Sequence, residues 1–561
     1  MSPFDISTDL LVVGTGSAAM TAALAARDEG LDVLVVESTE LYGGSSAMSG
    51  GGLWIPNNPV MREAGVLDSY EAARTYMDLV IGDVGPASSP ERRHAFLCEG
   101  PAMVDFLRQQ GVRFVYARGY ADYYPERPGG TPLGRAIEGD RWDIKKLGPW
   151  AKKVRGLIPM AAHTSEVGSI NPAFRSLRGF LTAANVVGVQ TILPLLIGKK
   201  RVGLGNALMG QLLYAALRRD IPVWLESPLV ELITDDDGAV TGAVVEREGK
   251  RLRIEARRGV MLAAGGFAHN QQMRTEHHPA PITTDWTSAN PGDVGTPIEA
   301  GIAVGAATAL MDDAWWGPSV LNPDGAAQFL LAERSLPHGF IVDSSGQRFM
   351  NESESYVDAG HHQFERNETV PAIPAYLVID SRHRSWYPFG MALPGMTPKK
   401  MIESGFFTKA DSLAELADKL GIDPEGLRTT AARFAQFART GVDEDFGRGD
   451  SAYDRVYSDP RVKPNPNLGA VSKPPFYAVK IWPGDLGTKG GLLTDEHARV
   501  LREDGSVIEG LYAAGNTSAS VMGRTYPGPG ATIGPAMTFG YIGGRHAAGL
   551  AATVAPAQDA A

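Results

Sequence analysis

The chain opens with short apolar runs separated by small-residue turns. Asp9–Val13 and Val33–Val36 are mostly apolar, and a helix-like stretch that reaches Glu29 lies between them. Apolar runs of this length are typical of parallel strands that are covered on both faces. The pattern therefore predicts a strand–helix–strand unit and an α/β fold.

Similar apolar runs recur far downstream and predict further strands of the same domain. They span residues 228–233, 239–246, 251–256, 260–266 and 511–515. The runs 239–246 and 251–256 are joined at Glu248-Gly249, which predicts an antiparallel pair. The domain is therefore assembled from both ends of the chain.

The middle of the chain follows a different pattern. From about Gly292 to about Lys480, aromatic residues, loops and amphipathic helices replace the glycine-rich turns. The pattern predicts a Rossmann-like domain that is interrupted by an α+β lobe. The expected boundaries are 1–291 for the first part of the Rossmann-like domain, 292–486 for the inserted lobe, and 487–561 for the second part.

Two helix starts are clear in this lobe. Ser412 and Glu415 have capping-box spacing and predict a helix to Leu420. Asp423 is followed by proline, which predicts an N-cap with proline at the first helical position and a helix to about Arg439.

The first turn of the chain carries a dinucleotide motif. Gly14 and Gly16 open a G-x-G-x-x-A pattern that ends at Ala19, and Glu37 follows the second strand. The glycines permit a tight turn and a close approach to pyrophosphate, the helix start meets the phosphates, and the acid binds ribose hydroxyls. Strand, helix, strand and acid in this order predict a dinucleotide site.

A second glycine-rich stretch favours FAD over NAD. Tyr42–Gly52 is a long glycine-serine loop at a place where an NAD domain would continue with another helix. A flavoprotein needs such a loop, because backbone must approach both the pyrophosphate and the flavin. The loop contains no histidine, so we expect non-covalent FAD. The candidate cofactor contacts are Gly14, Gly16, Ser17, Ala18, Ala19, Glu37, Gly43, Gly44, Ser45, Ser46, Gly51, Gly52, Val230, Ala264, Gly265, Gly515, Asn516, Gly530, Ala531 and Ile533.

The segment Leu511–Gly544 brings several of these features together. Tyr526-Pro-Gly-Pro-Gly530 is a rigid loop with a phenol and a backbone N–H four residues apart, and a helix start follows from Ala531. A helix start offers unpaired N–H groups to an anion or an electron-rich ring edge. A phenol and an N–H together are suited to hold a carbonyl oxygen on which negative charge develops.

Composition limits the remaining possibilities. A chain of 561 residues is too long for one core, and a net charge of −11 argues against nucleic acid as a partner. The single cysteine, Cys98, excludes an internal disulfide, and no histidine, cysteine or carboxylate spacing predicts a metal site. The N-terminus lacks a basic, apolar, cleavable pattern, so a cytoplasmic location is expected.

One segment departs from the acidic average. Residues 143–201 contain ten Lys or Arg and two acids, a net charge of +8, whereas the rest of the chain sums to −19. Within it, Gly179–Gly198 has no charged residue. A basic frame around an apolar stretch is typical of peripheral membrane contact. A buried helical insert and an oligomer contact are the alternatives.

The order of these motifs resembles the fumarate reductase/succinate dehydrogenase flavoprotein superfamily. Within it, the chain resembles the bacterial 3-ketosteroid Δ1-dehydrogenases along nearly its whole length. The matching segments are Tyr42-Gly-Gly-Ser-Ser through Trp54-Ile-Pro-Asn-Asn58, Gly119-Tyr-Ala-Asp-Tyr-Tyr-Pro-Glu126, Arg348-Phe-Met-Asn-Glu352 with Tyr356-Val-Asp358, and Tyr526-Pro-Gly-Pro-Gly530. The resemblance implies a 3-ketosteroid substrate, FAD, and an external electron acceptor such as a quinone.

The resemblance also implies a catalytic set. Desaturation beside a ketone removes a hydride from one carbon and a proton from the carbon alpha to the carbonyl. The Tyr526 hydroxyl and the Gly530 N–H are the candidates to hold the ketone oxygen. The resemblance assigns the base to Tyr356, with Tyr123 easing its ionisation and Tyr124 as the rival for that role. A phenol needs such help, since its ordinary pKa is about 10.

Three other readings make different predictions. A dicarboxylate-reducing relative carries His-Thr-x-Gly-Gly where this chain has Gly487-Thr-Lys-Gly-Gly491. A 3-ketosteroid Δ4-(5α)-dehydrogenase would share the lobes and the cofactor, but the Tyr526 loop and the Asp-Tyr-Tyr motif favour Δ1. A catalytically silent flavin-binding or membrane-associated protein is disfavoured by the complete tyrosine set.

Overall fold

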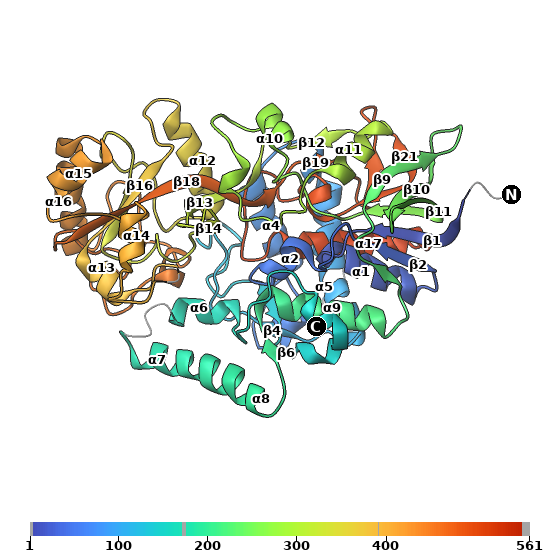
Figure 1. Ribbon diagram of the computed structural model, residues 1–561, viewed down its shortest axis with the longest axis horizontal. Coiled ribbons are helices and arrows are strands. Elements are labelled where there is room, and N and C mark those ends of the chain that lie inside the picture. Colours follow the sequence, from blue (N-terminus) through green and yellow to red (C-terminus); the bar gives the residue numbers. More distant parts are fainter. Residues whose placement is uncertain (1–3, 171–174, 391, 552–561) are drawn as a thin grey trace.

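The computed structural model describes residues 4–170, 175–390 and 392–551. The chain forms two lobes side by side (Figure 1). The lobe with the N-terminus contains the Rossmann-like sheet, and the other lobe contains most of the middle of the chain. A long strand, β18, runs from the second lobe toward the first.

The main sheet of the first lobe has the strand order β20-β21-β11-β1-β2-β8. Its strands are β1 (Ile6–Val13), β2 (Val33–Val36), β8 (Val223–Trp224), β11 (Lys250–Leu262), β20 (Arg499–Leu501) and β21 (Val507–Ala513). Strand β1 runs parallel to both β2 and β11, and β21 runs parallel to β11. The parallel βαβ unit predicted from the apolar runs is present.

One strand differs from the sequence prediction. The runs 251–256 and 260–266 were expected as separate strands, but they form the single strand β11 with an irregular register opposite Thr8 and Leu10. Its first half pairs antiparallel with β10 (Val240–Arg247), which pairs in turn with β9 (Leu229–Thr234). Its second half pairs with β21. One strand therefore serves two sets of partners, and the break in apolar pattern marks the change of partner.

Two helices with small residues pack tightly beneath the cofactor motif. They are α1 (Ser17–Asp28) and α17 (Ile533–Ala547). A Cβ on Gly540 would lie 2.4 Å from the Ala18 carbonyl oxygen, and one on Gly544 would lie 2.5 Å from that of Ala22. Only glycine permits this approach. The residue numbers rise together along both helices, so their N-terminal ends point the same way.

The second lobe has an antiparallel sheet with the order β14-β13-β18-β16-β15, and β17 also pairs with β18. The strands are β13 (Ala314–Leu321), β14 (Ala327–Phe329), β15 (Gly339–Val342), β16 (Ala375–Ile379), β17 (Thr408–Ala410) and β18 (Phe476–Thr488). Strand β18 crosses the predicted boundary between residues 486 and 487. The chain therefore passes from one lobe to the other without a linker at this point.

Helices pack around this sheet, and their starts follow the sequence. They are α12 (Tyr356–Asn367), α13 (Ser381–Trp386), α14 (Lys399–Glu403), α15 (Leu413–Leu420) and α16 (Pro424–Thr440). Ser412 Oγ accepts a hydrogen bond from the Glu415 N–H, and Asp423 Oδ1 accepts one from the Glu425 N–H. Both predicted caps are confirmed.

The remaining elements join the lobes or cover the Rossmann-like sheet. They are α2 (Gly44–Met48), β3 (Gly52–Trp54), α3 (Pro59–Glu63), α4 (Tyr70–Ile81), α5 (Pro90–Gln109), β4 (Phe114–Tyr116), β5 (Ala136–Gly139), β6 (Trp142–Asp143), α6 (Thr164–Ile170), β7 (Arg201–Val202), α9 (Leu204–Leu217), α10 (Gln271–His277), α11 (Thr296–Ala303), β12 (Thr308–Ala309) and β19 (Gly491–Leu492). The largest core lies among α1, α5, α9 and α17.

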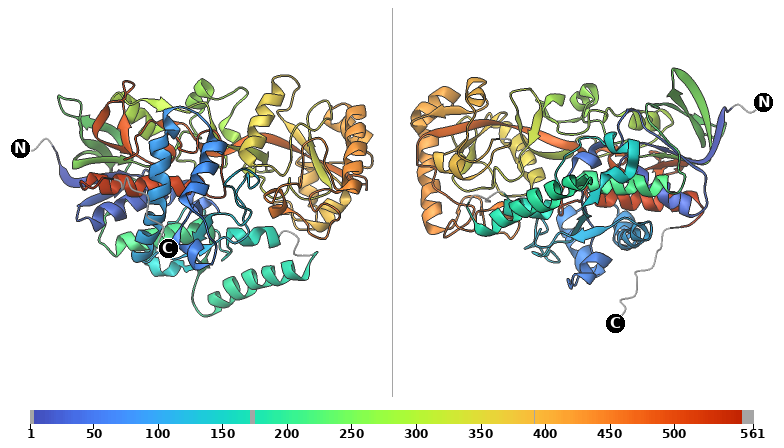
Figure 2. Two further views of the ribbon diagram at one scale, coloured as in Figure 1. Left: turned by 180° about the vertical axis from the view of Figure 1, so that it is seen from behind. Right: turned by 60° about the horizontal axis from the view of Figure 1, so that its bottom comes forward.

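The apolar stretch of the basic segment forms a helix that stands away from the body (Figures 1 and 2). It comprises α7 (Leu177–Ala184), π-helical turns (Asn185–Ile192) and α8 (Leu193–Leu196). Among the described residues, ten of the 21 exposed large hydrophobic side chains lie in residues 177–197. A buried insert, one of the two alternatives to membrane contact, is therefore not what the structure shows.

This helix, Leu177–Leu196, is also the one helix among the described residues that is long and apolar enough to cross a membrane. Length and composition alone are weak evidence for a span. Its flanks are tied to the body by Lys145 Nζ, which donates to the Gly198 carbonyl at 2.7 Å, and by Arg175, which pairs with Asp459 at 3.3 Å.

Candidate active site

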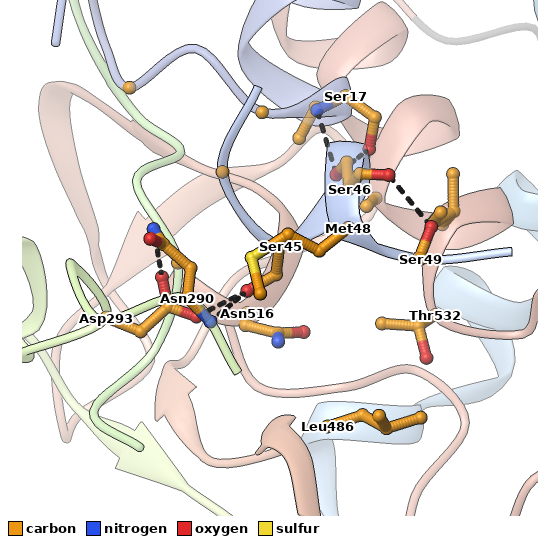
Figure 3. Close-up of a pocket in the computed structure, with 18 of the residues that line it drawn as sticks. Ser17, Ser45, Ser46, Met48, Ser49, Asn290, Asp293, Leu486, Asn516 and Thr532 are labelled. Carbon is orange, nitrogen blue, oxygen red and sulfur yellow. Dashed lines mark hydrogen bonds between the residues drawn. The ribbon is translucent and has the colours of Figure 1, made fainter. Parts of the chain in front are cut away.

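One long cavity contains both halves of the predicted site. It begins at the β1–α1 turn, passes the loop after β2, and ends among tyrosines contributed by both lobes. Figure 3 shows its central part, where Ser45 of α2 faces Asn290 and Asp293 and its neighbour Ser46 faces Ser17. The glycine motif and the tyrosine motif are therefore two ends of the same space.

The turn before α1 presents backbone to this cavity. Gly14 has φ +107°, and a Cβ there would lie 2.5 Å from the Ala263 carbonyl oxygen. Gly16 is the N-cap of α1, and the Ser17 N–H that follows it donates to Ser46 Oγ at 3.2 Å. A helix start of this kind presents its N–H groups to an anionic ligand such as a pyrophosphate.

Glu37 ends β2 with its carboxylate held in place. Its Oε2 accepts a hydrogen bond from Thr15 Oγ1 at 2.6 Å, and its Oε1 accepts from the N–H and hydroxyl of Thr39 at 3.1 and 3.0 Å. The carboxylate lines the cavity beyond the glycine turn. A ribose hydroxyl is the group that such an acid binds in a dinucleotide site.

A cluster that the sequence analysis did not predict braces the centre of the cavity. Ser45 Oγ donates to Asp293 Oδ2 at 3.0 Å and accepts from the Asn290 N–H at 2.9 Å (Figure 3). Asn290 Nδ2 donates to Asp293 Oδ1 at 3.2 Å. Burial raises the pKa of Asp293 to about 7. The Asn290-Pro-Gly-Asp293 turn was the available signal, but its partner Ser45 is 248 residues away.

Sixteen of the twenty predicted cofactor residues line the cavity, and four do not. Those on its wall are Gly14, Gly16, Ser17, Ala18, Glu37, Gly44, Ser45, Ser46, Gly51, Gly52, Ala264, Gly265, Gly515, Asn516, Gly530 and Ile533. Those outside it are Ala19, Gly43, Val230 and Ala531. At this end of the cavity the wall is formed by Ser227 and Pro228, which precede β9, and by Leu229, the first residue of that strand.

The other end of the cavity is a cluster of tyrosines. The rings of Tyr123 and Tyr356 have centroids 5.5 Å apart, those of Tyr123 and Tyr526 5.2 Å, and those of Tyr356 and Tyr526 4.9 Å. Tyr123 lies in the loop between β4 and β5, Tyr356 is the first residue of α12, and Tyr526 lies in the loop before α17. Three segments far apart in sequence thus meet at one point.

Burial controls the acidity of these phenols. It raises the pKa of Tyr123 and Tyr356 well above the ordinary value of 10. It also raises the pKa of Tyr526, but hydrogen bonds from Thr532, Tyr356 and the Gly530 backbone oppose that increase. Thr532 Oγ1 donates to the Tyr526 oxygen at 3.2 Å. Tyr526 and the Gly530 backbone therefore converge on one place.

The backbone at Gly530 excludes every other residue type. Its φ is +94°, and a Cβ would lie 2.4 Å from the Gly52 carbonyl carbon. The Gly530 carbonyl accepts a hydrogen bond from the Trp54 N–H at 3.1 Å. The loop before α17 is therefore locked against β3, with the Tyr526 and Gly530 donors held in register.

The geometry separates Tyr123 from its rival. Tyr124 turns its hydroxyl away from the other tyrosines and donates to Asp358 Oδ1 at 3.0 Å. The Tyr123 N–H donates to the Pro527 carbonyl at 2.9 Å, which fixes its ring beside Tyr526. Tyr123 is thus the residue that faces Tyr356.

Further aromatic residues surround the cluster, and the sequence analysis gave them no role. Tyr453 stacks on Tyr123 at 4.0 Å between centroids, and the hydroxyls of Tyr120 and Tyr457 are 2.5 Å apart. Phe329 and Leu331 add an apolar wall. No motif marks Tyr453 or Tyr457, so only the fold reveals them.

The lysine of the Gly487–Gly491 segment is not directed into the cavity as a free cation. Lys489 is buried and pairs with Asp313 at 3.1 Å, and Asp313 also accepts from His361 at 2.8 Å. A cation that is neutralised in this way is a poor clamp for a substrate carboxylate.

Comparisons with known proteins agree with this geometry. A family model described as an FAD binding domain matches residues 9–533. A 3-oxosteroid 1-dehydrogenase of Mycobacterium tuberculosis (strain ATCC 25618 / H37Rv) is 48% identical over 557 residues, which cover 96% of this chain and 98% of that protein. Both indicate an FAD-dependent oxidoreductase.

Two solved structures extend the comparison. The crystal structure of 3-ketosteroid delta1-dehydrogenase from Sterolibacterium denitrificans in complex with 1,4-androstadiene-3,17-dione has a TM-score of 0.92 and 39% identity, and covers 97% of this chain and 99% of its own. A 3-ketosteroid-delta4-(5alpha)-dehydrogenase from Rhodococcus jostii RHA1 has a TM-score of 0.64 and 22% identity, and covers 98% of each chain. The second likeness shows a shared fold alone.

Proposed function

The chain belongs to the family of FAD-binding flavoproteins that includes the 3-oxosteroid 1-dehydrogenases, and we propose that it desaturates the C1–C2 bond of 3-ketosteroids. The observation that carries this proposal is the meeting of Tyr123, Tyr356 and Tyr526 beside Gly530 at one end of the FAD cavity. FAD, when bound, supplies the acceptor for the hydride that leaves C1.

The residues of the chain handle the ketone and the proton. Tyr526 and the Gly530 N–H donate to the C3 oxygen and stabilise the negative charge that develops on it. Preorganised donors of this kind are typically worth about 3–4 kcal/mol. Tyr356 takes the C2 proton, and Tyr123 stands against Tyr356 and orients it. The family resemblance implies the roles of Tyr356 and Tyr123, and the convergence of these side chains supports them.

The rest of the tyrosine end suits an apolar ligand. Phe329, Leu331, Met48 and Leu486 line the cavity together with small residues. At this end of the cavity, the protein has a single polar group of the steroid to recognise, the ketone, and the rest of the fused-ring surface is hydrocarbon. Shape and apolar contact therefore provide most of its binding, and the ketone fixes its register.

Turnover of 4-androstene-3,17-dione with an artificial acceptor tests the proposal. The expected product is lighter by two hydrogens and has its new double bond between C1 and C2. A Δ4-(5α)-dehydrogenase would leave this substrate unchanged, because its Δ4 bond is already present. Absence of turnover by enzyme that contains stoichiometric FAD would contradict the proposed reaction.

The natural oxidant is proposed to be an external acceptor such as a quinone. Anaerobic turnover with a soluble quinone should match or exceed the rate in air without it. Reoxidation by oxygen alone at the full rate would contradict this part of the proposal.

We further propose that the exposed helix Leu177–Leu196 docks the enzyme on an anionic membrane surface at the cytoplasmic side. Leu177, Phe180 and Leu196 are 75, 57 and 77% exposed, and the exposed basic residues Arg178 and Lys199 lie at the two ends of the stretch. Each basic residue near such a surface contributes about 1 kcal/mol, and salt screens this term. A steroid partitions into lipid, so docking would shorten its route to the cavity.

Vesicle co-sedimentation tests the docking. Binding to anionic vesicles should weaken at high salt without vanishing, because the apolar contact is not screened. Deletion of residues 176–198 with a short bridge should abolish co-sedimentation and leave bound flavin in place. Leu196→Glu should weaken binding, whereas Leu67→Glu, at a side chain that is 93% exposed elsewhere, should not. A stable dimer that is lost with the deletion and ignores vesicles would instead identify an oligomer contact.

A further inference from the structure

A buried arginine lies behind the tyrosine cluster and forms no ion pair within 4.0 Å among the described residues. Arg334 is 1% exposed and lies in the loop between β14 and β15. Its NH1 donates to the Glu352 carbonyl at 2.7 Å, and its NH2 donates to the Glu354 carbonyl at 2.7 Å. Both acceptors belong to the short segment that ends at Tyr356, so the arginine grips the backbone that delivers the proposed base.

This pairing differs from that of two other buried arginines, whereas Arg92 and Arg384 likewise donate to backbone carbonyls and form no ion pair among the described residues. Arg274 pairs with Asp485 at 2.8 Å, and Arg348 pairs with Asp443 at 2.7 Å and with Glu352 at 2.8 Å. Among the ion pairs of the described residues, Arg334 forms none within 4.0 Å. The charge of Arg334 acts on the buried Glu354 carboxyl, where it opposes the increase in pKa that burial causes, as well as on neighbouring phenols.

The neighbours that feel this charge are members of the tyrosine cluster. Burial raises the pKa of Tyr453 and Tyr457, and the charge of Arg334 opposes that increase in both. Tyr453 stacks on Tyr123, and Tyr123 faces Tyr356. The positive charge of Arg334 therefore favours the ionised forms of Tyr453 and Tyr457.

A buried asparagine, Asn467, connects the loop that carries Arg334 to the segments on either side of the tyrosine cluster. Asn467 Nδ2 lies within hydrogen-bond distance of three acceptors, namely Ser353 Oγ at 3.1 Å, the Ser335 carbonyl at 3.0 Å and the Asp454 carbonyl at 2.7 Å. Asn351 Nδ2 donates to Asp454 Oδ2 at 3.0 Å. The segment before Tyr356 and the segment that carries Tyr453 and Tyr457 are therefore held together.

We propose that Arg334 is a positioning residue for the base: it clamps residues 352–354 so that Tyr356 meets Tyr123 and Tyr526, and it places a positive charge on the side of the cluster formed by Tyr453 and Tyr457. This inference rests on the proposed function, because it concerns the base of that reaction. Arg334 acts through Tyr356 and does not itself line the cavity.

The titratable groups that face Tyr356 define what a pH profile reports. They come from its own helix, from the loops at 117–135 and 523–532, from the segment around 454, and from the loop before α12: Tyr120, Tyr123, Tyr453, Tyr457, Tyr526, Glu354, Asp358, His361 and His362. The phenols titrate in the alkaline range. The rise of kcat/KM with pH above neutrality, which we call the alkaline limb, therefore reports on them.

The test compares Arg334→Met with Arg334→Lys in flavin-loaded enzyme. The Met variant loses both the clamp and the charge, and its kcat should fall at least about tenfold, since a displaced base costs rate steeply. Its alkaline limb of kcat/KM should move up by about one pH unit, the size expected when a nearby charge is removed. Steroid affinity, read from the flavin absorbance change on titration, should stay within about threefold of wild type, because Arg334 does not line the cavity.

The Lys variant separates the two contributions. Lysine keeps the positive charge but cannot reproduce the two hydrogen bonds that the guanidinium donates to the Glu352 and Glu354 carbonyls. The kcat of this variant should therefore fall several-fold, while its alkaline limb stays at the wild-type pH. Arg92→Lys is the matched control, at a buried arginine that also donates to a backbone carbonyl, that of Ala519, outside residues 352–356, and it should leave the limb in place. If the Met variant does not fold, the Lys variant alone decides. An unchanged kcat in Arg334→Lys overturns the clamp. A shift of its alkaline limb to higher pH, although the positive charge is retained, overturns the role of the charge.

Other outcomes are equally decisive. A folded Met variant with wild-type kcat and limb overturns the proposal, and so does a loss of steroid affinity equal to the loss of rate. Wild-type enzyme without Δ1 activity would instead refute the proposed function, which is measured first and separately.

Discussion

The two ends of the cavity are built by opposite means. At the cofactor end, backbone forms the wall: the turn at Gly14, the start of α1 and the serine loop after Gly43, with Glu37 as the main charged group. At the substrate end, side chains form the wall, and they come from loops and helices of both lobes. The dinucleotide, a ligand common to many enzymes, is held by backbone turns that a short stretch of sequence encodes. The reaction depends on side chains that come together from distant segments, and no short stretch of sequence encodes that.

The strongest way to break this comparison is to add a side chain at the cofactor end. Gly14→Val requires a Cβ 2.5 Å from the Ala263 carbonyl oxygen at a φ of +107°, so we expect loss of bound FAD and, with it, of all activity. Flavin absorbance per mole of purified protein is the measurement. Gly65→Val, at a glycine with positive φ and open space around its Cβ, is the matched control and should keep its flavin. Yellow, active Gly14→Val enzyme would refute the assignment of this turn.

At the substrate end, single atoms should matter instead. Tyr356→Phe and Tyr526→Phe should each lower kcat by at least about a hundredfold, the usual worth of a positioned base or donor. Flavin content should stay normal, because neither hydroxyl is assigned to the cofactor. Stopped-flow flavin reduction measures the loss directly. Near-wild-type reduction in either variant removes that residue from the mechanism.

The pH profile sharpens the same contrast. Burial raises the pKa of Tyr356 above its ordinary value, so at neutral pH only a small fraction is ionised. A base that works ionised then gives a kcat/KM that rises about tenfold per pH unit from about pH 7 to pH 9, and the raised pKa places the plateau at higher pH. Flavin binding should stay level across this range. A flat kcat/KM would exclude a tyrosine base.

The smallest expected effect distinguishes two neighbouring tyrosines. Tyr123→Phe should lower kcat about five- to tenfold, because the partner of the base is lost. Tyr124→Phe removes only the hydroxyl that donates to Asp358, so its kcat should stay within about threefold and its cost should fall on stability. Thermal melting of both variants accompanies the kinetics. The reverse order of effects would transfer the role to Tyr124.

The sequence predicts the cofactor end well because that end is local. Gly14, Gly16 and Glu37 lie within one βαβ unit, and the structure places all three on the cavity wall. Val230 lies in β9, one residue beyond the wall residues Ser227–Leu229, and its contact with the cofactor stays a prediction. The apolar pattern predicts where the strand lies. Which of its residues faces a ligand depends on the path of the chain just before the strand.

The rest could not be predicted because it depends on distant contacts. Asp293 acquires its place from Ser45, and Tyr453 acquires its place by stacking on Tyr123. The apolar stretch 179–198 was visible in the sequence, but its exposure was not, because the same composition serves a core helix. The tyrosine motifs could be found through family resemblance, whereas their neighbours carry no motif of their own.

Strand β18 has a consequence for the rate at which substrate exchanges. Its backbone pairs with β13 up to Thr488, and Thr488 Oγ1 accepts a hydrogen bond from the Phe267 N–H of the other lobe. The strand thus connects the sheet of the second lobe to the first lobe, and moving the lobes apart would have to bend it or break the hydrogen bond to Phe267. We therefore expect ligand exchange to depend on the loops at the rim of the cavity, whose motions fall in the nanosecond-to-microsecond range, and not on hinge motion between the lobes.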